Sequence, residues 1–152
     1  MNASPDRSRF STRDAIDLLA ATFGLPNEPW MQDWEIQVAD PSRIDDFLAV
    51  YESESLSEDC RFSLMQILLQ CFEDLPHRPE SDPRWPRLIR CLRMDSGIHD
   101  STIEYWTGIE SEKLGDAWRV SKPLRNIFRV SPVSGIDATS DLCQPNRGTN
   151  NQ

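Results

Sequence analysis

The chain has few of the residues from which catalytic and metal sites are usually built. It contains 2 histidines and 4 cysteines among 152 residues. Neither histidine has a second histidine four residues away, and no Cys-x-x-Cys pair occurs, so zinc-site spacing is absent. Glycine-rich phosphate loops and the Gly-x-Ser-x-Gly turn are absent as well. We therefore expect a protein that is not an enzyme and that uses no cofactor or metal.

Long hydrophobic runs are also missing. No stretch approaches the roughly 20 apolar residues that cross a bilayer, and the first residues lack the apolar core of a secretory signal. Cys60 and Cys71 lie on one predicted helix about 16 Å apart, too far for a disulfide. Reduced thiols and the missing signals favour a cytoplasmic protein with no membrane partner.

Helix signals are frequent along the chain. Apolar residues recur every three or four positions after residues that can cap a helix N-terminus. The predicted helices begin at Ser11 or Thr12, Ser42, Ser57, Asp82, Asp100 or Ser101, and Ser121. In the first helix the expected core-facing stripe is Ala15, Leu18, Leu19 and Thr22. Residues 35–39 alternate in polarity and give the nearest candidate for a strand, or an extended connector.

The predicted helix over residues 57–75 is apolar around most of its circumference. Only Ser63, Gln66 and Gln70 form a narrow polar strip on it. Such a helix belongs in the middle of a bundle. We therefore predict an all-α fold, a compact bundle of five to six helices around this central helix. The expected organisation is a flexible N-terminus (1–10), one helical domain (11–130) and a disordered tail (131–152), which is poor in large apolar residues.

Negative charge is concentrated in one part of the sequence. The net charge is −9, and residues 28–59 contain ten acidic residues against one arginine. Such a segment either steers a basic partner towards it or is only a solvated surface. It disfavours nucleic-acid binding, which requires a basic patch. Arginines recur every third residue from Arg84 to Arg93, and we expect them to pair with neighbours and with the acidic helices.

The candidate partner-binding residues combine this acidic segment with its tryptophans. They are Trp30, Asp33, Trp34, Asp45, Asp46 and Glu52. Tryptophan is frequent among residues that dominate binding energy at protein interfaces. The alternative is that tryptophans fill the core, which we expect of Trp85, Trp106 and Trp118, whereas both roles stay open for Trp30 and Trp34.

Three short stretches resemble a group of small bacterial all-helical proteins. They are residues 56–65 (LSEDCRFSLM), 101–106 (STIEYW) and 120–125 (VSKPLR). Some members of this group resemble immunity proteins, which neutralise a toxin made alongside them. The resemblance spans roughly residues 42–129 and rests on core and capping positions. It implies an inhibitory binding function and carries over no catalytic residue.

Three functions follow from these observations. The leading hypothesis is a non-enzymatic module that binds a basic protein through its acidic face, as an immunity-type inhibitor would. A second is a structural protein that self-associates as a homo-oligomer through Trp30 and Trp34. A third is an enzyme with a site at His99, where Asp95, Asp100 or Glu104 would orient the imidazole as a general base.

Overall fold

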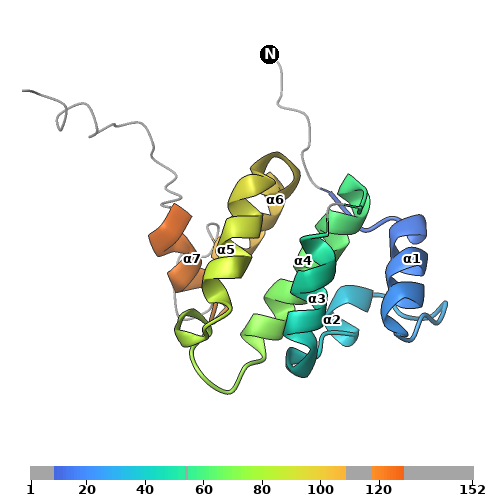
Figure 1. Cartoon of the computed structure of the whole chain (residues 1–152), viewed down its shortest axis with the longest axis horizontal. Coiled ribbons are helices and arrows are strands. Elements are labelled where there is room, and N and C mark those ends of the chain that lie inside the picture. The colour runs from blue at the N-terminus through green and yellow to red at the C-terminus, as the bar shows by residue number, and fades with distance from the viewer. Residues whose placement is uncertain (1–8, 54, 109–117, 129–152) are drawn as a thin grey trace, which may run out of the picture.

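The fold is built from helices throughout the part that can be described. The computed structural model describes residues 9–53, 55–108 and 118–128, and over these ranges it contains seven α-helices and no strand. The α-helices are α1 (Arg13–Phe23), α2 (Trp34–Gln37), α3 (Ile44–Tyr51), α4 (Glu58–Glu73), α5 (Trp85–Met94), α6 (Ser96–Thr107) and α7 (Ser121–Phe128) (Figure 1). Two 3-10 turns, Pro41–Arg43 and Pro79–Ser81, precede α3 and α5. The all-α prediction is confirmed, and the tail predicted over residues 131–152 lies outside the described residues.

Local capping fixes where several helices begin and end. The Thr12 hydroxyl accepts a hydrogen bond from the Ala15 amide at 3.1 Å and starts α1. Gly24 ends that helix with a φ of 67°, a left-handed conformation that glycine adopts without strain. The Ser57 hydroxyl caps α4 by accepting from the Cys60 amide at 3.2 Å. The helix starts at Thr12 and Ser57 were predicted from the sequence and are confirmed.

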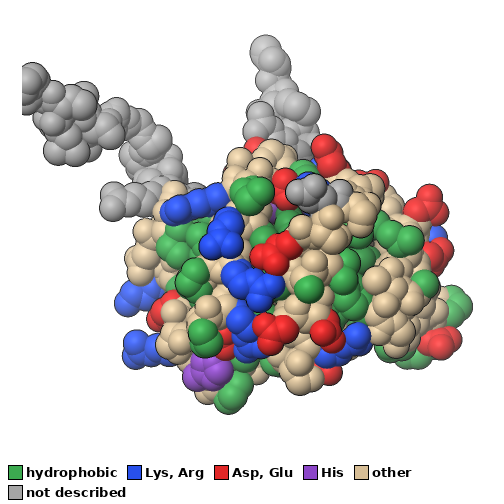
Figure 2. Space-filling view, viewed as in Figure 1, with side chains coloured by type: hydrophobic (Ala, Val, Ile, Leu, Met, Phe, Trp, Pro, Cys, Tyr) green, Lys and Arg blue, Asp and Glu red, His purple; other side chains and the backbone are tan. Residues whose placement is uncertain are grey.

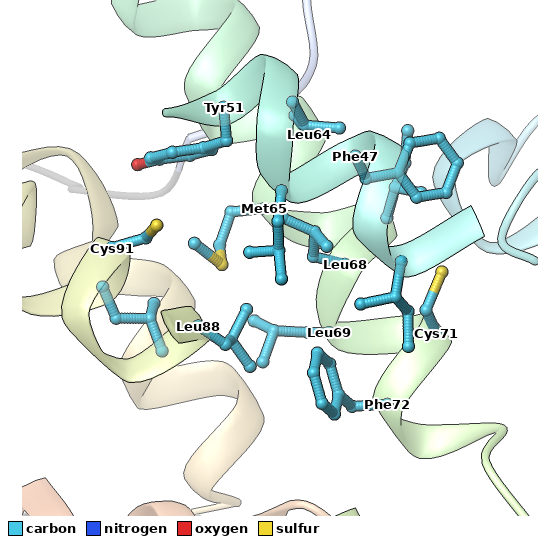
Figure 3. Close-up of a cluster of buried hydrophobic side chains, with 14 of the residues drawn as sticks. Phe47, Tyr51, Leu64, Met65, Leu68, Leu69, Cys71, Phe72, Leu88 and Cys91 are labelled. Carbon is cyan, nitrogen blue, oxygen red and sulfur yellow. The ribbon is translucent and has the colours of Figure 1, made fainter. Parts of the chain in front are cut away.

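Helix α4 is the centre of the molecule, as its composition predicted. Most of its residues are buried, and it packs against α1, α2, α3 and α6. Figure 3 shows its side chains Met65, Leu69 and Phe72 between those of α3 and α5. The rings of Phe72 and Trp85 meet edge to face with centroids 5.5 Å apart.

Two residues of the polar strip of α4, Ser63 and Gln66, contact neighbouring segments of the protein. Ser63 is fully buried, and its hydroxyl lies 2.6 Å from that of Ser11. The amide group of Gln66 joins α4 to α6, donating to the Thr102 hydroxyl at 2.8 Å and accepting from the Trp106 indole at 2.9 Å. These polar residues therefore set how neighbouring segments lie on an otherwise apolar helix.

Two local predictions are wrong, and a third is confirmed only in part. Residues 34–37 form a single helical turn, with Trp34 and Val38 buried, so the alternating pattern at 35–39 marks neither a strand nor an extended connector. Leu18 is 48% exposed because Ala15, Leu19 and Phe23 form the buried face of α1. Helix α6 consists of two helical segments joined across a kink at His99, so the second segment begins at the predicted Asp100, whereas the helical turn from Ser96 was not predicted.

The helices form two layers (Figure 1). The N-terminal layer is α1–α4 and the C-terminal layer is α5–α7, with the main contacts between them made by α4 with α6 and by α3 with α5. A charged clasp joins the layers at the end of α4. Glu73 accepts from the backbone amides of Arg119 and Val120, and the Arg119 guanidinium donates to the carbonyls of Glu73, Leu75 and His77. The start of α7 is thereby fixed to the end of α4.

Three of the 4 cysteines lie in the described ranges. Cys60, Cys71 and Cys91 are buried free thiols, and Cys143 lies outside the ranges described. Among the helices of those ranges, none has the length and apolar character to cross a membrane.

Candidate functional site

Much of the predicted acidic face is neutralised by arginines of the same chain. Asp45 lies 3.4 Å from Arg84 and 3.6 Å from Arg87, and Glu52 lies 2.8 Å from Arg87. These pairs form a charged seam where α3 meets α5, visible in Figure 2 as adjoining blue and red side chains. The expected contact between the arginine row and the acidic helices is confirmed for Arg84 and Arg87.

Arg84 also holds a buried carboxylate on its own side of this seam. The Asp82 side chain is 2% exposed and accepts from both Arg84 and His77. The hydrogen bonds from Arg84 hold the pKa of Asp82 well below its usual range. His77 and Arg84 therefore stabilise the loop before α5, and neither is free to act on a ligand.

Other acids of the predicted face have partners as well. Asp46 lies 3.6 Å from Arg43, and Arg9 reaches both Glu58 and Asp59. A partner that bound Asp45, Asp46 or Glu52 would compete with these internal ion pairs. Binding through those three residues stays a prediction.

Most carboxylates of residues 13–40 have no ion pair among the described residues. Residues 13–40 carry six acidic residues and one arginine, a net charge of −5. Arg13 is engaged there by Asp17 at 3.4 Å. The remaining carboxylates in this segment have no ion pair within the described ranges; they are Asp14, Glu28, Asp33, Glu35 and Asp40.

Large apolar side chains are exposed on the same segment. Leu18 is 48% exposed, Trp30 71% and Ile36 47%. In Figure 2, hydrophobic and acidic side chains are mixed over the part of the surface formed by α1 and the loop after it. We call this surface the acidic–apolar end and define it by Asp14, Leu18, Glu28, Trp30, Asp33, Glu35 and Ile36.

Trp34 does not contribute to this surface. It is 2% exposed, and its indole donates to the Pro26 carbonyl at 2.7 Å. Of the two tryptophans whose roles were left open, Trp34 thus belongs to the core and Trp30 to the surface. Trp34 packs inward because α2 is a helical turn lying on α4.

A second site candidate is a buried polar cluster between the layers, which we call the histidine cluster. The Tyr51 hydroxyl donates to Asp95 Oδ2 at 2.6 Å and lies 2.7 Å from His99 Nε2. Arg61 donates to Asp95 Oδ1 at 3.3 Å. His99 is fully buried, and no residue in the described part of the chain forms a hydrogen bond with His99 Nδ1 or Arg61 Nε.

The chemistry of this cluster does not resemble that of a catalytic centre. Burial lowers the pKa of His99 to about 4, although the Asp95 carboxylate opposes the shift. Burial and Asp95 also raise the pKa of the Tyr51 hydroxyl far above its ordinary value. The nearby Cys91 thiol has its pKa raised to about 11, mainly by burial, so it is a poor nucleophile (Figure 3). The cluster is a network of neutral or internally paired groups without an activated nucleophile.

No protein-family model, curated protein or solved structure matches this chain. Function must therefore be inferred from the geometry itself. Within residues 9–53, 55–108 and 118–128, no three side chains of the metal-binding types come together. Two features remain for interpretation: the acidic–apolar end and the histidine cluster.

Sequence reasoning found parts of the histidine cluster but not the whole. The spacing of Asp95 and His99 suggested that a carboxylate orients the imidazole, yet the Tyr51 hydroxyl lies between them. In the sequence, Tyr51 recurs with Phe47 and Leu48 at helical spacing, and it lies on the buried face of α3. A tyrosine at a core position, rather than phenylalanine, was the available signal, since a buried hydroxyl requires a partner.

Proposed function

We propose that this protein is a non-enzymatic binding module that engages a basic protein through the acidic–apolar end. The observation that carries the proposal is Trp30, 71% exposed on a segment with a net charge of −5. Exposed tryptophan supplies large contact area, and unpaired carboxylates steer a cationic surface towards it. Carboxylates already held by an arginine supply less of that attraction, which favours this end over the seam.

The narrower form of the proposal is an immunity-type inhibitor of a basic protein toxin. It is supported by the resemblance of residues 56–65, 101–106 and 120–125 to immunity-like proteins and by the acidic surface. The buried, unpaired thiols suit a reducing compartment, and we propose a cytoplasmic location. An inhibitor of this kind should abolish the activity of the toxin at equimolar concentration.

The test is affinity capture from a host lysate at low and at high salt, followed by binding measurements with the purified partner. Trp30→Ala and Asp33→Lys should each weaken binding at least tenfold, and Asp33→Lys should also reduce its salt dependence. Met94→Ala removes another exposed apolar side chain (75% exposed), and Glu104→Lys makes the same charge change on α6. Both controls should bind as the unmodified protein does. Equal effects of test and control variants would exclude the acidic–apolar end.

Self-association is the second candidate, and the same exposed Trp30 supports it. Because Trp34 is in the core, the relevant variant is Trp30→Ala alone. A dimer in light scattering that Trp30→Ala dissociates would favour this function. The net charge of −9 opposes contact between two copies, which is why we rank a basic partner first.

A further inference from the structure

The histidine cluster joins the two layers of the fold. Tyr51 belongs to α3 and Arg61 to α4, whereas Asp95 and His99 lie at the junction of α5 and α6. The hydrogen bonds from Tyr51 and Arg61 to this junction therefore cross from the N-terminal to the C-terminal layer. Any change that breaks them weakens the contact between the layers.

The hydrogen-bond directions determine which imidazole nitrogen carries the proton. Arg61 donates to Asp95 Oδ1, and Asp95 Oδ2 accepts the hydroxyl proton of Tyr51. The Tyr51 oxygen then accepts from His99, whose proton must be on Nε2. Nδ1 is consequently an unprotonated, buried acceptor to which none of the described residues donates.

A second proton can enter the imidazole only at Nδ1. There it would form a charged N–H group in a fully buried position, where no described residue provides an acceptor. An unsatisfied buried charge is among the most destabilising features a fold can contain. Separating the layers would hydrate that charge.

We propose that the histidine cluster is an acid-sensitive latch, in which proton uptake at His99 releases α5 and α6 from α3 and α4. The latch is closed at neutral pH because the imidazole is neutral and donates through Nε2. It opens as the pH falls, because the open form holds the second proton more tightly than the closed form does.

The charges around His99 support this direction. Arg61 from α4 and Arg9 from the segment before α1 both disfavour an imidazolium, whereas Asp95 favours it. Asp95 is already engaged by Tyr51 and Arg61. Tyr51 and Cys91 stay neutral, and Asp100 neighbours His99 on α6 itself.

Amide hydrogen exchange on the intact protein tests the latch. The amides of α5 and α6 should share one protection factor, lower than that of the central α4 amides. The protection factor of the α5 and α6 amides should fall about tenfold for each unit by which the pH is lowered from about 6.5 to about 4, because one proton is taken up on opening. One common protection factor for all helices, or no pH dependence in α5 and α6, would overturn the proposal.

Substitution separates His99 from the many carboxylates of the protein. Glutamine donates to Tyr51 through its amide and takes up no proton, so His99→Gln should abolish the fall in α5 and α6 protection above pH 4.5. His77→Gln is the matched control, because His77 is the other histidine of the chain and is half-exposed. The control should retain the full pH dependence, and an equal response of the two variants would refute the latch.

Nuclear magnetic resonance of the unsubstituted protein gives a result even where His99→Gln fails to fold. The imidazole of His99 should remain neutral down to about pH 4. Its nitrogen shifts should show the proton on Nε2. Titration near pH 6.5, or a proton on Nδ1 at neutral pH, would contradict the latch.

Discussion

Replacing Tyr51 with phenylalanine isolates the hydroxyl that connects the two layers. The ring would keep its place in the core, since Tyr51 is only 4% exposed. Asp95 Oδ2 would lose its 2.6 Å donor and His99 Nε2 its 2.7 Å acceptor. Two groups on the C-terminal layer would be left without partners by the removal of one oxygen atom.

The size of the effect depends on how far each orphaned group can reach water. A buried group that loses its partner costs about 1–3 kcal/mol. The Asp95 side chain is 18% exposed and can recover a water molecule, whereas His99 is fully buried and cannot. We therefore expect Tyr51→Phe to lower the free energy of unfolding by about 2–4 kcal/mol, a large fraction of the usual 5–15 kcal/mol.

Urea denaturation followed by tryptophan fluorescence measures this change. The midpoint should fall by about 1–2 M with an unchanged slope. Tyr105→Phe is the matched control, because Tyr105 is 56% exposed, and its free energy of unfolding should change by less than about 0.5 kcal/mol. A loss below about 1 kcal/mol for Tyr51→Phe would show that the hydroxyl does not hold the layers together.

Two further substitutions test other contacts described above. Gln66→Met keeps the side-chain shape but removes the partner of the buried Trp106 indole and Thr102 hydroxyl, so the free energy of unfolding in urea should fall by about 2–4 kcal/mol. Gln70→Met is the control, because the Gln70 amide donates to the exposed carboxylate of Asp74, and its free energy of unfolding should change by less than about 0.5 kcal/mol. Equal losses for the two variants would contradict the role of Gln66. Gly24→Ala has open space around its new methyl group but forces alanine to a φ of 67°, so calorimetry should show a loss of about 1 kcal/mol, and no loss would mean that the left-handed cap is dispensable.

The helices were predictable because their signals are local. Thr12 and Ser57 bond to amides three residues away, and Gly24 sets its own backbone angle. The central position of α4 followed from its nearly continuous apolar surface. None of these inferences requires knowledge of the rest of the fold.

Features that depend on contacts between distant segments could not be predicted from the sequence. The strand-like alternation at 35–39 is overridden because a single turn of helix buries Trp34 against α4. Asp45 and Asp33 are both acidic residues of one segment, yet of these two it is Asp45 that pairs with Arg84 and Arg87 at the start of α5. Which carboxylates remain available to a partner is decided by that long-range pairing.

The clasp of Glu73 and Arg119 lies at the opposite end of α4 from Arg61, about 18 Å away along the helix axis. It closes the chain from 73 to 119 into a loop, so α5 and α6 are tethered at both of their ends. In the proposed latch, α5 and α6 would rotate about this clasp, and the α5–α6 corner would move furthest. Because the clasp would keep the ends of this loop together, closing the latch again would require little further loop-closure entropy.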